Sequence, residues 1–462
     1  MKNSGARQFV FALGCSLTAA LAITTGCVAP SQETDAESSF EGTLQAVMVG
    51  NAELGAHFEY FLEDGRGAWT RLLFDQRPEW LSSEGGHEHL LLPGQEQVDM
   101  TRQVKLRVTG VPDGTTVHVT DLEVTASAAA DVASASQALI ASSPRKVAVI
   151  LANFSNNTSQ PLTPAAALAL VFGGTQSPNA YFKEASFGIR SLVGKLSPAG
   201  DVFGWYTIPA GNSPCDYSAW GAAARAAAQS AGVVLTGYDH IIHYFPHSAS
   251  CGWSGVGQVP GKYTWINGSS AQTIAHELGH NFGAHHASSY TCTDASGMRV
   301  PISSTCTTSE YGNPFDVMGR GYRHMTAFNK GRIGFLEPEN TTTVTADGTF
   351  TVAPLEQKST QTQALRIPIN ATTAYYVEFR QSSGFDTFTA WSPVVNGVLI
   401  TRAPLSYSTL ARPLLLDMVP ASTSFSDAAL PVGKTFTDVT AGIRVTLSSI
   451  AATGATLSID IP

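Results

Sequence analysis

The stretch AHELGHNFGAHHASS, from Ala275 to Ser289, carries four histidines, one glutamate and two glycines in fifteen positions. Apolar residues recur at steps of four and predict the buried face of an amphipathic helix, namely Ile274, Leu278 and Phe282. His276 and His280 are also four residues apart, so they lie together on the side opposite that face. The pattern therefore predicts a helix that is anchored in a core and offers two imidazoles to one metal ion.

Glu277 and the residues after the helix decide what such a site can do. Glu277 lies about 100° round the helix from the first histidine, where it can reach a water beside the metal and act as a general base. Gly283 can adopt the positive φ that ends a helix, so the following residues turn back toward the metal. Geometry alone leaves His285 and His286 as alternatives for a third ligand.

The N-terminus has the features of an export signal. Lys2 and Arg7 precede a short apolar stretch, residues 9–23, and small residues lead to Cys27. A simple cleaved signal and lipidation of Cys27 are both open, because Thr24 stands where bacterial lipoprotein signals usually have Leu. We therefore expect an exported bacterial protein, either secreted or held at the outer membrane or cell surface as a lipoprotein, with no membrane contact beyond that anchor.

The length and the patterning predict several parts. The 462 residues suffice for two or three domains, and the formal net charge of −9 argues against a nucleic-acid partner. The predicted parts are a signal peptide (1–27), a tether (28–39), a β-rich region (40–125), an Ala/Ser-rich linker (126–145), a domain of strands and helices (146–338) and a β-sandwich (339–462). The fold class is thus α+β, with a mixed sheet in the central domain.

Local patterns place individual elements in these parts. Two alternating runs around a turn predict a hairpin at residues 105–124, and Asp216 can cap an Ala-rich helix. Continuous apolar runs at 146–154 and 238–245 predict buried strands. A capping box places the start of the histidine helix near Ser270.

Four cysteines follow the signal segment, and all lie in the middle third of the chain. They are Cys215, Cys251, Cys292 and Cys306. An exported protein is expected to oxidise them, and three connectivities are available. We favour the pairing of sequence neighbours, Cys215–Cys251 and Cys292–Cys306.

The pattern HExxHxxGxxH, at residues 276–286, resembles the metzincin zinc signature. The resemblance selects the third ligand, so zinc is expected to be bound by His276, His280 and His286. It also implies that Glu277 takes a proton from the attacking water and passes it to the leaving amine.

Within the metzincins, the chain is most similar to the gametolysin family of secreted metalloendopeptidases. The stretches CGWSGVGQVPGKYTWINGSS, YGNPFDVMG and HMTAFNKGRIGFL carry this similarity, which spans about residues 146–338. It implies that Met318 forms the floor of the site in a tight turn, without binding metal. Some metzincins place a tyrosine two residues after this methionine; Arg320 stands there, which leaves Tyr322 as a candidate for stabilising the oxyanion.

The resemblance further implies an edge strand above the cleft, within residues 253–259, along which an extended substrate binds. The substrate-contact candidates are Trp253, Ser254, Gly255, Val256 and Gly257. Backbone hydrogen bonds of an added strand give affinity without strict side-chain choice. The glycines would permit the close approach of a peptide.

The chain differs from several metzincins that are kept latent by a cysteine of the pro-segment, which occupies the zinc. The sequence contains no cysteine between Val28 and Pro214. If residues 40–145 are a propeptide, another group must block the cleft, such as a carboxylate or His87 and His89. Otherwise this region is a permanent module and the enzyme is never latent.

Taken together, these features predict an exported zinc endopeptidase that acts as a monomer on extended polypeptides without a covalent intermediate. A surface adhesin or binding lipoprotein with a structural metal site is an alternative, although Glu277 would then have no role. A zinc hydrolase of cell-wall peptides is another. Zn²⁺ is the expected cofactor, and a structural Ca²⁺ is a further candidate that the sequence does not decide.

Overall fold

The computed structural model describes residues 36–51, 55–77, 80–84, 87–90, 92, 104–127, 144–268, 270–407 and 412–462. The predictions on the signal peptide, on the lipidation of Cys27 and on most of the linker fall outside these residues, as do the side chains of His87 and His89. Residues 37–462 form one compact unit. Within the described ranges, every helix is too short or too polar to cross a membrane.

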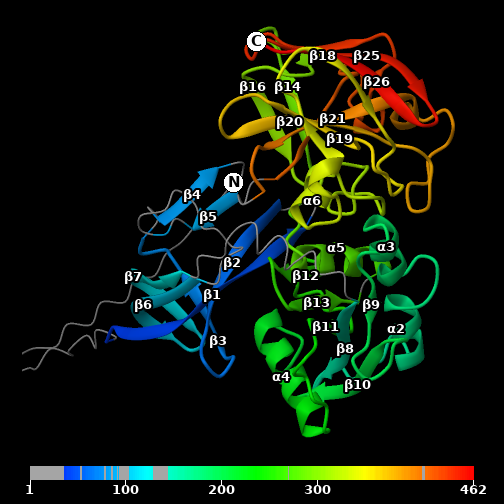
Figure 1. Ribbon diagram of the computed structural model, residues 1–462. Coiled ribbons are helices and arrows are strands. Elements are labelled where there is room, and N and C mark those ends of the chain that lie inside the picture. The colour runs from blue at the N-terminus through cyan, green and yellow to red at the C-terminus, as the bar shows by residue number, and fades with distance from the viewer. Residues whose placement is uncertain are drawn as a thin grey trace, which may run out of the picture. The chain divides into compact units, whose positions relative to one another are not determined.

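A mixed sheet between two helical layers forms the centre of the chain (Figure 1). Its strands, in spatial order, are β10 (Asp201–Ile208), β8 (Arg145–Phe154), β11 (His240–Phe245), β13 (Tyr263–Asn267) and β12 (Gly255–Gln258). The first four are parallel and β12 is antiparallel to β13. A short strand, β9 (Leu192–Val193), pairs with β8. The buried strands predicted at 146–154 and 238–245 are confirmed as β8 and β11.

Both faces of this sheet are buried, as strand β8 illustrates. Val147, Val149 and Leu151 pack against one helical layer and Ala148, Ile150 and Ala152 against the other, because successive side chains of a strand point to opposite faces. The first layer contains α2 (Pro164–Val171), α3 (Pro178–Ala185) and α5 (Ala271–Asn281). The second is α4 (Tyr217–Ser230), which begins at Asp216 as predicted, since the Asp216 side chain accepts the Ala219 N–H.

The N-terminal region is a closed ring of strands. In order around the ring these are β1 (Ser38–Asn51), β2 (Gly55–Glu63), β3 (Trp69–Leu73), β7 (Thr116–Ser127) and β6 (Val104–Asp113), which pairs back to β1. A separate pair, β4 (Leu81–Glu84) and β5 (His87–Leu90), lies beside it. The hairpin predicted at 105–124 is confirmed as β6 and β7.

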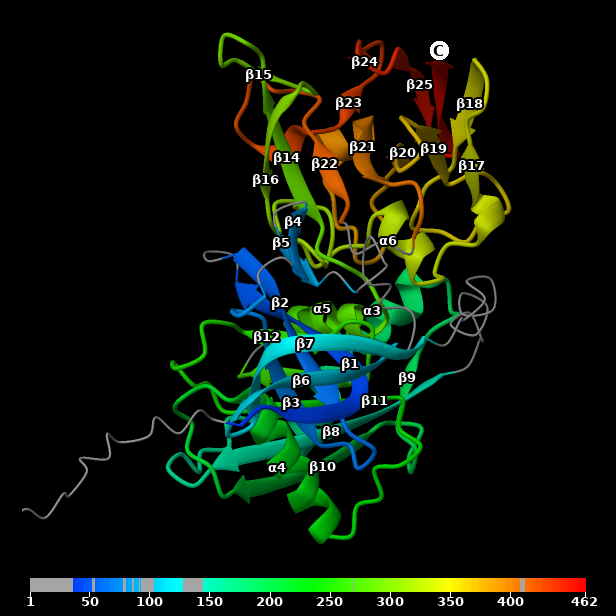
Figure 2. The same ribbon diagram turned by 90° about the vertical axis from the view of Figure 1, so that its left-hand side faces the viewer.

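Two sheets share one core in the C-terminal part (Figure 2). One contains β18 (Gly348–Val352), β24 (Thr435–Asp438), β25 (Ile443–Ala451) and β26 (Gly454–Asp460). The other contains β14 (Ser288–Thr293), β15 (Arg299–Val300), β16 (Thr305–Ser309), β17 (Thr341–Thr343), β19 (Ala364–Pro368), β20 (Thr373–Phe379), β21 (Gly397–Pro404), β22 (Leu414–Leu416) and β23 (Leu430–Pro431). Because β14–β16 follow α5 directly, this sheet takes strands from both sides of residue 339.

Short helices complete the described chain, namely α6 (Ala327–Arg332) and three 3-10 turns at Pro338–Asn340, Pro393–Asn396 and Phe425–Asp427. The described chain is strand-rich, with several sheets and a smaller number of helices, which is consistent with the predicted α+β class.

Candidate metal centre and active site

Helix α5 has the boundaries that the sequence predicts. It begins after Ser270, whose hydroxyl accepts the Thr273 N–H, and it ends at Asn281, with Phe282 as the C-cap. Gly283 then adopts a φ of 101°, which an L-residue with a side chain rarely adopts and which turns the chain sharply. Ile274 and Leu278 are fully buried against the sheet, so the opposite face of the helix is held in place.

Three histidines converge on that opposite face. One ring nitrogen from each of His276, His280 and His286 lies within 4.8 Å of the others. In the part of the chain that the structure describes, this is the single cluster of three or more His, Cys, Asp or Glu side chains able to share one ion. His285 points elsewhere, with its ring 5.9 Å from that of Phe58 in β2. The structure thus brings together the three histidines that the resemblance selects.

The hydrogen bonds of these histidines leave the Nε2 atoms turned inward. The Nδ1 of His276 lies 2.8 Å from the Val317 carbonyl, and the Nδ1 of His280 lies 2.9 Å from the Ala284 carbonyl. A carbonyl only accepts, so each Nδ1 donates and each Nε2 keeps its lone pair. The Nε2 atoms of His280 and His286 are 3.0 Å apart.

Such a close approach of unprotonated nitrogens fits a shared cation. Tetrahedral zinc with nitrogens at about 2.0–2.1 Å places them roughly 3.4 Å from one another. Burial lowers the pKa of His276 to about 3, with the neighbouring His286 adding to the shift, and it lowers the pKa of His280 in the same direction. The imidazoles of His276 and His280 are therefore neutral at physiological pH, as metal ligands must be.

Glu310 supports the third histidine and was missed by the sequence reasoning. Its Oε1 lies 2.6 Å from the Nδ1 of His286 and 2.9 Å from the Nη1 of Arg412. Its Oε2 accepts the N–H of Ala56, in β2, at 2.6 Å. The carboxylate therefore fixes the tautomer and direction of His286 and raises its basicity as a ligand.

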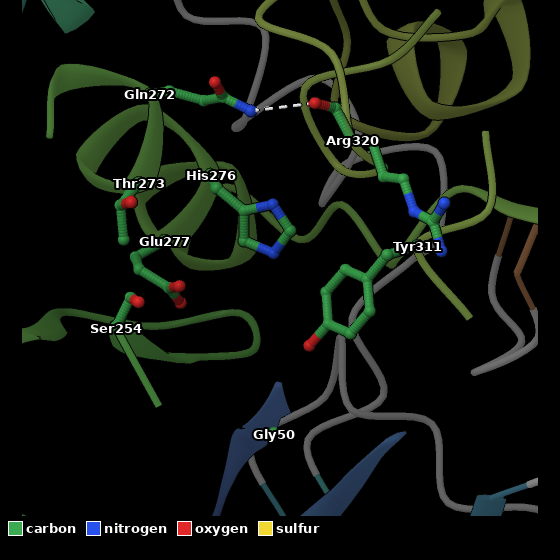
Figure 3. A pocket seen from close by; sticks show the side chains of 10 residues that line it. Gly50, Ser254, Gln272, Thr273, His276, Glu277, Tyr311 and Arg320 are labelled. Atoms are coloured by element: carbon green, nitrogen blue, oxygen red, sulfur yellow. Dashed lines mark hydrogen bonds between the residues drawn. The ribbon is translucent and has the colours of Figure 1, made fainter. Parts of the chain in front are cut away.

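An open pocket lies beside the histidines (Figure 3). Its lining residues are Gly50, Ser254, Gly255, Gln272, Thr273, His276, Glu277, Tyr311, Gly319 and Arg320. Glu277 is only 6% exposed, and burial raises the pKa of its carboxyl well above the usual range. The carboxyl of Glu277, the ring of His276 and the hydroxyl of Tyr311 face the same opening.

Tyr311 is the second residue that the sequence reasoning missed. Its ring centroid is 4.0 Å from that of His286 and 5.7 Å from that of His276. Its backbone has a φ of 56°, a conformation that the local sequence pattern does not predict. Burial raises the pKa of the hydroxyl, which therefore keeps its proton and can donate it in a hydrogen bond.

Tyr322, the candidate from the sequence, is engaged elsewhere. Its hydroxyl donates to the Gln176 carbonyl at 3.0 Å, and its ring stacks on Tyr181. It does not line the pocket. We therefore assign no chemistry to Tyr322.

Met318 lies directly under the histidine helix. It is fully buried, and a Cβ placed on Gly279 would stand 2.5 Å from its Sδ. Its backbone is held by the Ala287 N–H, which donates to the Met318 carbonyl, and by its own N–H, which donates to Asp316. This is the position expected for the floor of the site.

Strand β12 lies along the helix on the other side of the pocket. Of the five predicted substrate-contact residues, only Ser254 and Gly255 line the pocket, while Trp253 and Val256 are buried. A Cβ on Gly255 or Gly257 would stand 2.7 or 2.6 Å from atoms of Glu277. The glycines therefore allow strand and helix to touch, which differs from the predicted approach of a peptide. Nor is β12 an edge in this structure, because β1 pairs with its outer side.

The comparisons with known proteins agree with this geometry. Residues 193–383 match the family described as gametolysin peptidase M11. This match supports a gametolysin-family metallopeptidase domain in this part of the chain. The match begins after the predicted start at residue 146, runs past the predicted end at 338, and contains α5, Met318, Glu310 and Tyr311. No curated protein matches the chain.

Two disulfides brace the gametolysin-type domain. Cys215 is bonded to Cys251, and Cys292 is bonded to Cys306, which is the pairing that we favour from the sequence. The first ties the start of α4 to the loop before β12. The second joins β14 to β16, close to Glu310.

Proposed function

We propose that the gametolysin-type domain is a zinc-dependent endopeptidase with His276, His280 and His286 as ligands and Glu277 as general base. The observation that carries this proposal is the convergence of three imidazoles beside the buried carboxyl group of Glu277 in an open pocket. Three protein ligands with an open side characterise catalytic zinc, whereas structural zinc usually has four protein ligands. A zinc ion held there would polarise the scissile carbonyl and lower the pKa of the attacking water.

The chain's own groups supply the remaining chemistry. The positive charge of a zinc ion held by the histidines would favour the ionised form of Glu277 over the protonated form that burial favours. As a carboxylate, Glu277 accepts the proton of the attacking water and then passes it to the nitrogen of the leaving amine, so that no covalent intermediate with the protein forms. Tyr311 takes the role predicted for Tyr322: its hydroxyl donates a hydrogen bond to the oxyanion that develops on the carbonyl oxygen. The raised pKa of Tyr311 is consistent with this role, because the hydroxyl must carry its proton.

The same geometry weighs against a structural metal site in an adhesin. Such a site would have no use for a pocket at the metal or for Glu277 in its wall. Hydrolysis of cell-wall peptides would use the same machinery, so that alternative differs only in substrate. We further propose that the protein is an exported metzincin that acts as a monomer on extended polypeptides. The proposal of export draws support from the N-terminal pattern and the two disulfides.

Hydrolysis of an unfolded protein tests this function. The chain is assayed intact and after trimming near Arg145, with and without a chelator, alongside Glu277→Gln. We expect chelation to abolish hydrolysis, zinc to restore it, and Glu277→Gln to lose about 10²–10⁴-fold in rate while it keeps one zinc per chain by metal analysis. The exposed Glu339 provides a matched control, Glu339→Gln. Wild-type hydrolysis that survives metal removal, or full activity in Glu277→Gln, would contradict the proposal.

A further inference from the structure

The outer side of strand β12 is occupied by the chain's own N-terminal strand. β1 pairs antiparallel with β12, with Val47 opposite Gln258 and Met48 opposite Gly257. The pairing continues past β12, where the Val259 N–H donates to the Ala46 carbonyl at 3.0 Å. The side-chain amide of Gln258 also donates to that of Gln45. The ring and the central sheet are thus joined by one continuous ladder.

Both faces of β1 are buried, each in a different core. Leu44, Ala46 and Met48 belong to the core of the ring, which also takes in Val259 from the peptidase domain. Val47 and Val49 belong to the core of α4 and the central sheet, together with Trp253 and Val256. This alternation fixes the register, because a slip by one residue would exchange the two faces.

Other contacts bring the ring to the active site itself. Gly50, near the end of β1, lines the pocket beside His276 and Glu277. The Ala56 N–H donates to Glu310, the carboxylate that supports His286. Farther along β2, Glu59 accepts a hydrogen bond from the hydroxyl of Tyr217, in α4, at 2.6 Å.

We infer that β1 occupies the site along which an extended substrate binds, and that the N-terminal ring holds the peptidase inactive until β1 is displaced. This inference rests on the proposed function and names its regulation. The backbone groups on one side of a strand can pair with only one partner, so β1 and a substrate strand exclude each other on β12. Because β1 belongs to the same chain, it competes as an intramolecular ligand with a high effective concentration.

Strand occupancy also explains how latency is kept without a pro-segment cysteine. The region at 40–125 is then a propeptide that blocks the cleft with backbone, rather than with a side chain on the metal. Glu310 would lose its Ala56 partner on release but keep His286 and Arg412. The metal centre therefore stays assembled in both states.

Weakening the contacts from the ring side tests the inference in the full chain. The double variant Gln45→Ala/Glu59→Ala removes the amide pair with Gln258 and the acceptor of Tyr217. It also removes two pairs within the ring, Gln45 with Glu63 and Glu59 with Arg71, and it changes no residue of the peptidase domain. We expect hydrolysis of an unfolded protein to rise by about tenfold or more, since each such bond shifts the equilibrium by roughly five- to tenfold. Glu41→Gln is the matched control: Glu41 is an exposed carboxylate of the same ring, paired with Arg107, and its loss should leave the rate unchanged.

A disulfide should have the opposite effect. Ala46→Cys/Val259→Cys joins β1 to the residue that follows β12, whereas Ser39→Cys/Thr109→Cys joins β1 to β6 within the ring, since Ser39 and Thr109 are opposite each other. The first staple should suppress hydrolysis when oxidised and release it on mild reduction; the second should behave as wild type in both states. Wild type treated with the same reductant controls for the native disulfides.

The outcomes separate this inference from the proposed function. If hydrolysis depends on Glu277 but neither variant changes its rate, β1 does not regulate the enzyme and the inference is wrong. If no form hydrolyses protein, the proposed function has failed, and hydrogen exchange then decides the occupancy. The amide of Val259 should exchange at least tenfold faster in Gln45→Ala/Glu59→Ala than in wild type or Glu41→Gln. Equal rates would overturn the occupancy itself.

Discussion

Replacing Glu310 by glutamine should weaken the metal centre without removing a ligand. Glu310 accepts from the Nδ1 of His286 at 2.6 Å and is only 11% exposed, so the bond is short and largely shielded from water. A hydrogen bond to a charged group contributes about 1.5–3 kcal/mol and a neutral one about 0.5–1.5 kcal/mol. Glu310→Gln keeps a neutral acceptor, so the expected loss is about 1–2 kcal/mol. This corresponds to a zinc affinity about 5–30-fold weaker.

The measurement is zinc affinity by competition with a chromophoric chelator at one pH. Glu339→Gln, at an exposed position, should change the affinity by less than about twofold. Urea unfolding of the zinc-free forms shows whether Glu310→Gln has also damaged the fold, because Glu310 pairs with the buried Arg412 as well. A Glu310→Gln chain that binds zinc as tightly as wild type would refute the view that this carboxylate tunes His286.

Three further predictions concern the oxyanion, the floor of the site and the response to acid. Tyr311→Phe should lower kcat by about 10²-fold with KM changed less than threefold, because one oxyanion donor is lost; an unchanged kcat would remove Tyr311 from the mechanism. Gly279→Ala should lower the free energy of unfolding by about 1–3 kcal/mol through overpacking, since its Cβ would stand 2.5 Å from the Met318 Sδ; urea titration measures this. Gly65→Ala is the control, because a Cβ there meets no atom and φ is not positive, and it should change the free energy of unfolding by less than about 0.5 kcal/mol. Burial lowers the pKa of His240 to about 4, so the unfolded chain binds more protons between pH 6.5 and 4, and the free energy of unfolding should fall as pH is lowered through that window, by about 3 kcal/mol in total. Urea titrations across this range should show a shallower fall in His240→Gln, and identical slopes would contradict this assignment.

The histidine helix could be predicted from the sequence because its determinants are local. The four-residue spacing of His276 and His280, the apolar face at Ile274 and Leu278, and the stop at Gly283 all act within one or two helical turns. The same holds for the capped helix at Asp216 and for the buried strands. In each case the structure agrees to within a residue or two.

Glu310 and Tyr311 were beyond this kind of reasoning. They follow β16, and they reach the site only because that strand pairs with β14, which itself follows the third histidine. Neither a periodicity nor a spacing links a carboxylate at 310 to an imidazole at 286. A disulfide between Cys292 and Cys306 was the one available sign that this segment folds back toward the site.

The partner of β12 was unpredictable for a similar reason. The sequence indicates a short glycine-containing strand before the helix, but it cannot say which strand pairs with its outer side. That strand, β1, lies more than two hundred residues earlier, and its sequence pattern is equally compatible with a ring that makes no contact with the central sheet. Only the three-dimensional arrangement shows that its odd-numbered valines, Val47 and Val49, have their core in the other domain.

The packing of β12 against α5 sets the position, relative to Glu277, of any strand that pairs with β12, whether this strand is a substrate or β1. Because Gly255 and Gly257 pack closely against Glu277, any strand added to the outer side of β12 lies at a fixed distance from this proposed general base. This distance would place the scissile bond of a substrate strand near Glu277, and β1 lies at the same position. β1, however, is held along its other side by β2, through pairs from Thr43 to Asn51, and its side chains are buried in two cores. A scissile peptide must distort toward a tetrahedral centre, and a strand clamped on both sides resists that distortion. If β1 blocks the site as we propose, it is positioned like a substrate but held like a core strand, and this difference would protect it from hydrolysis.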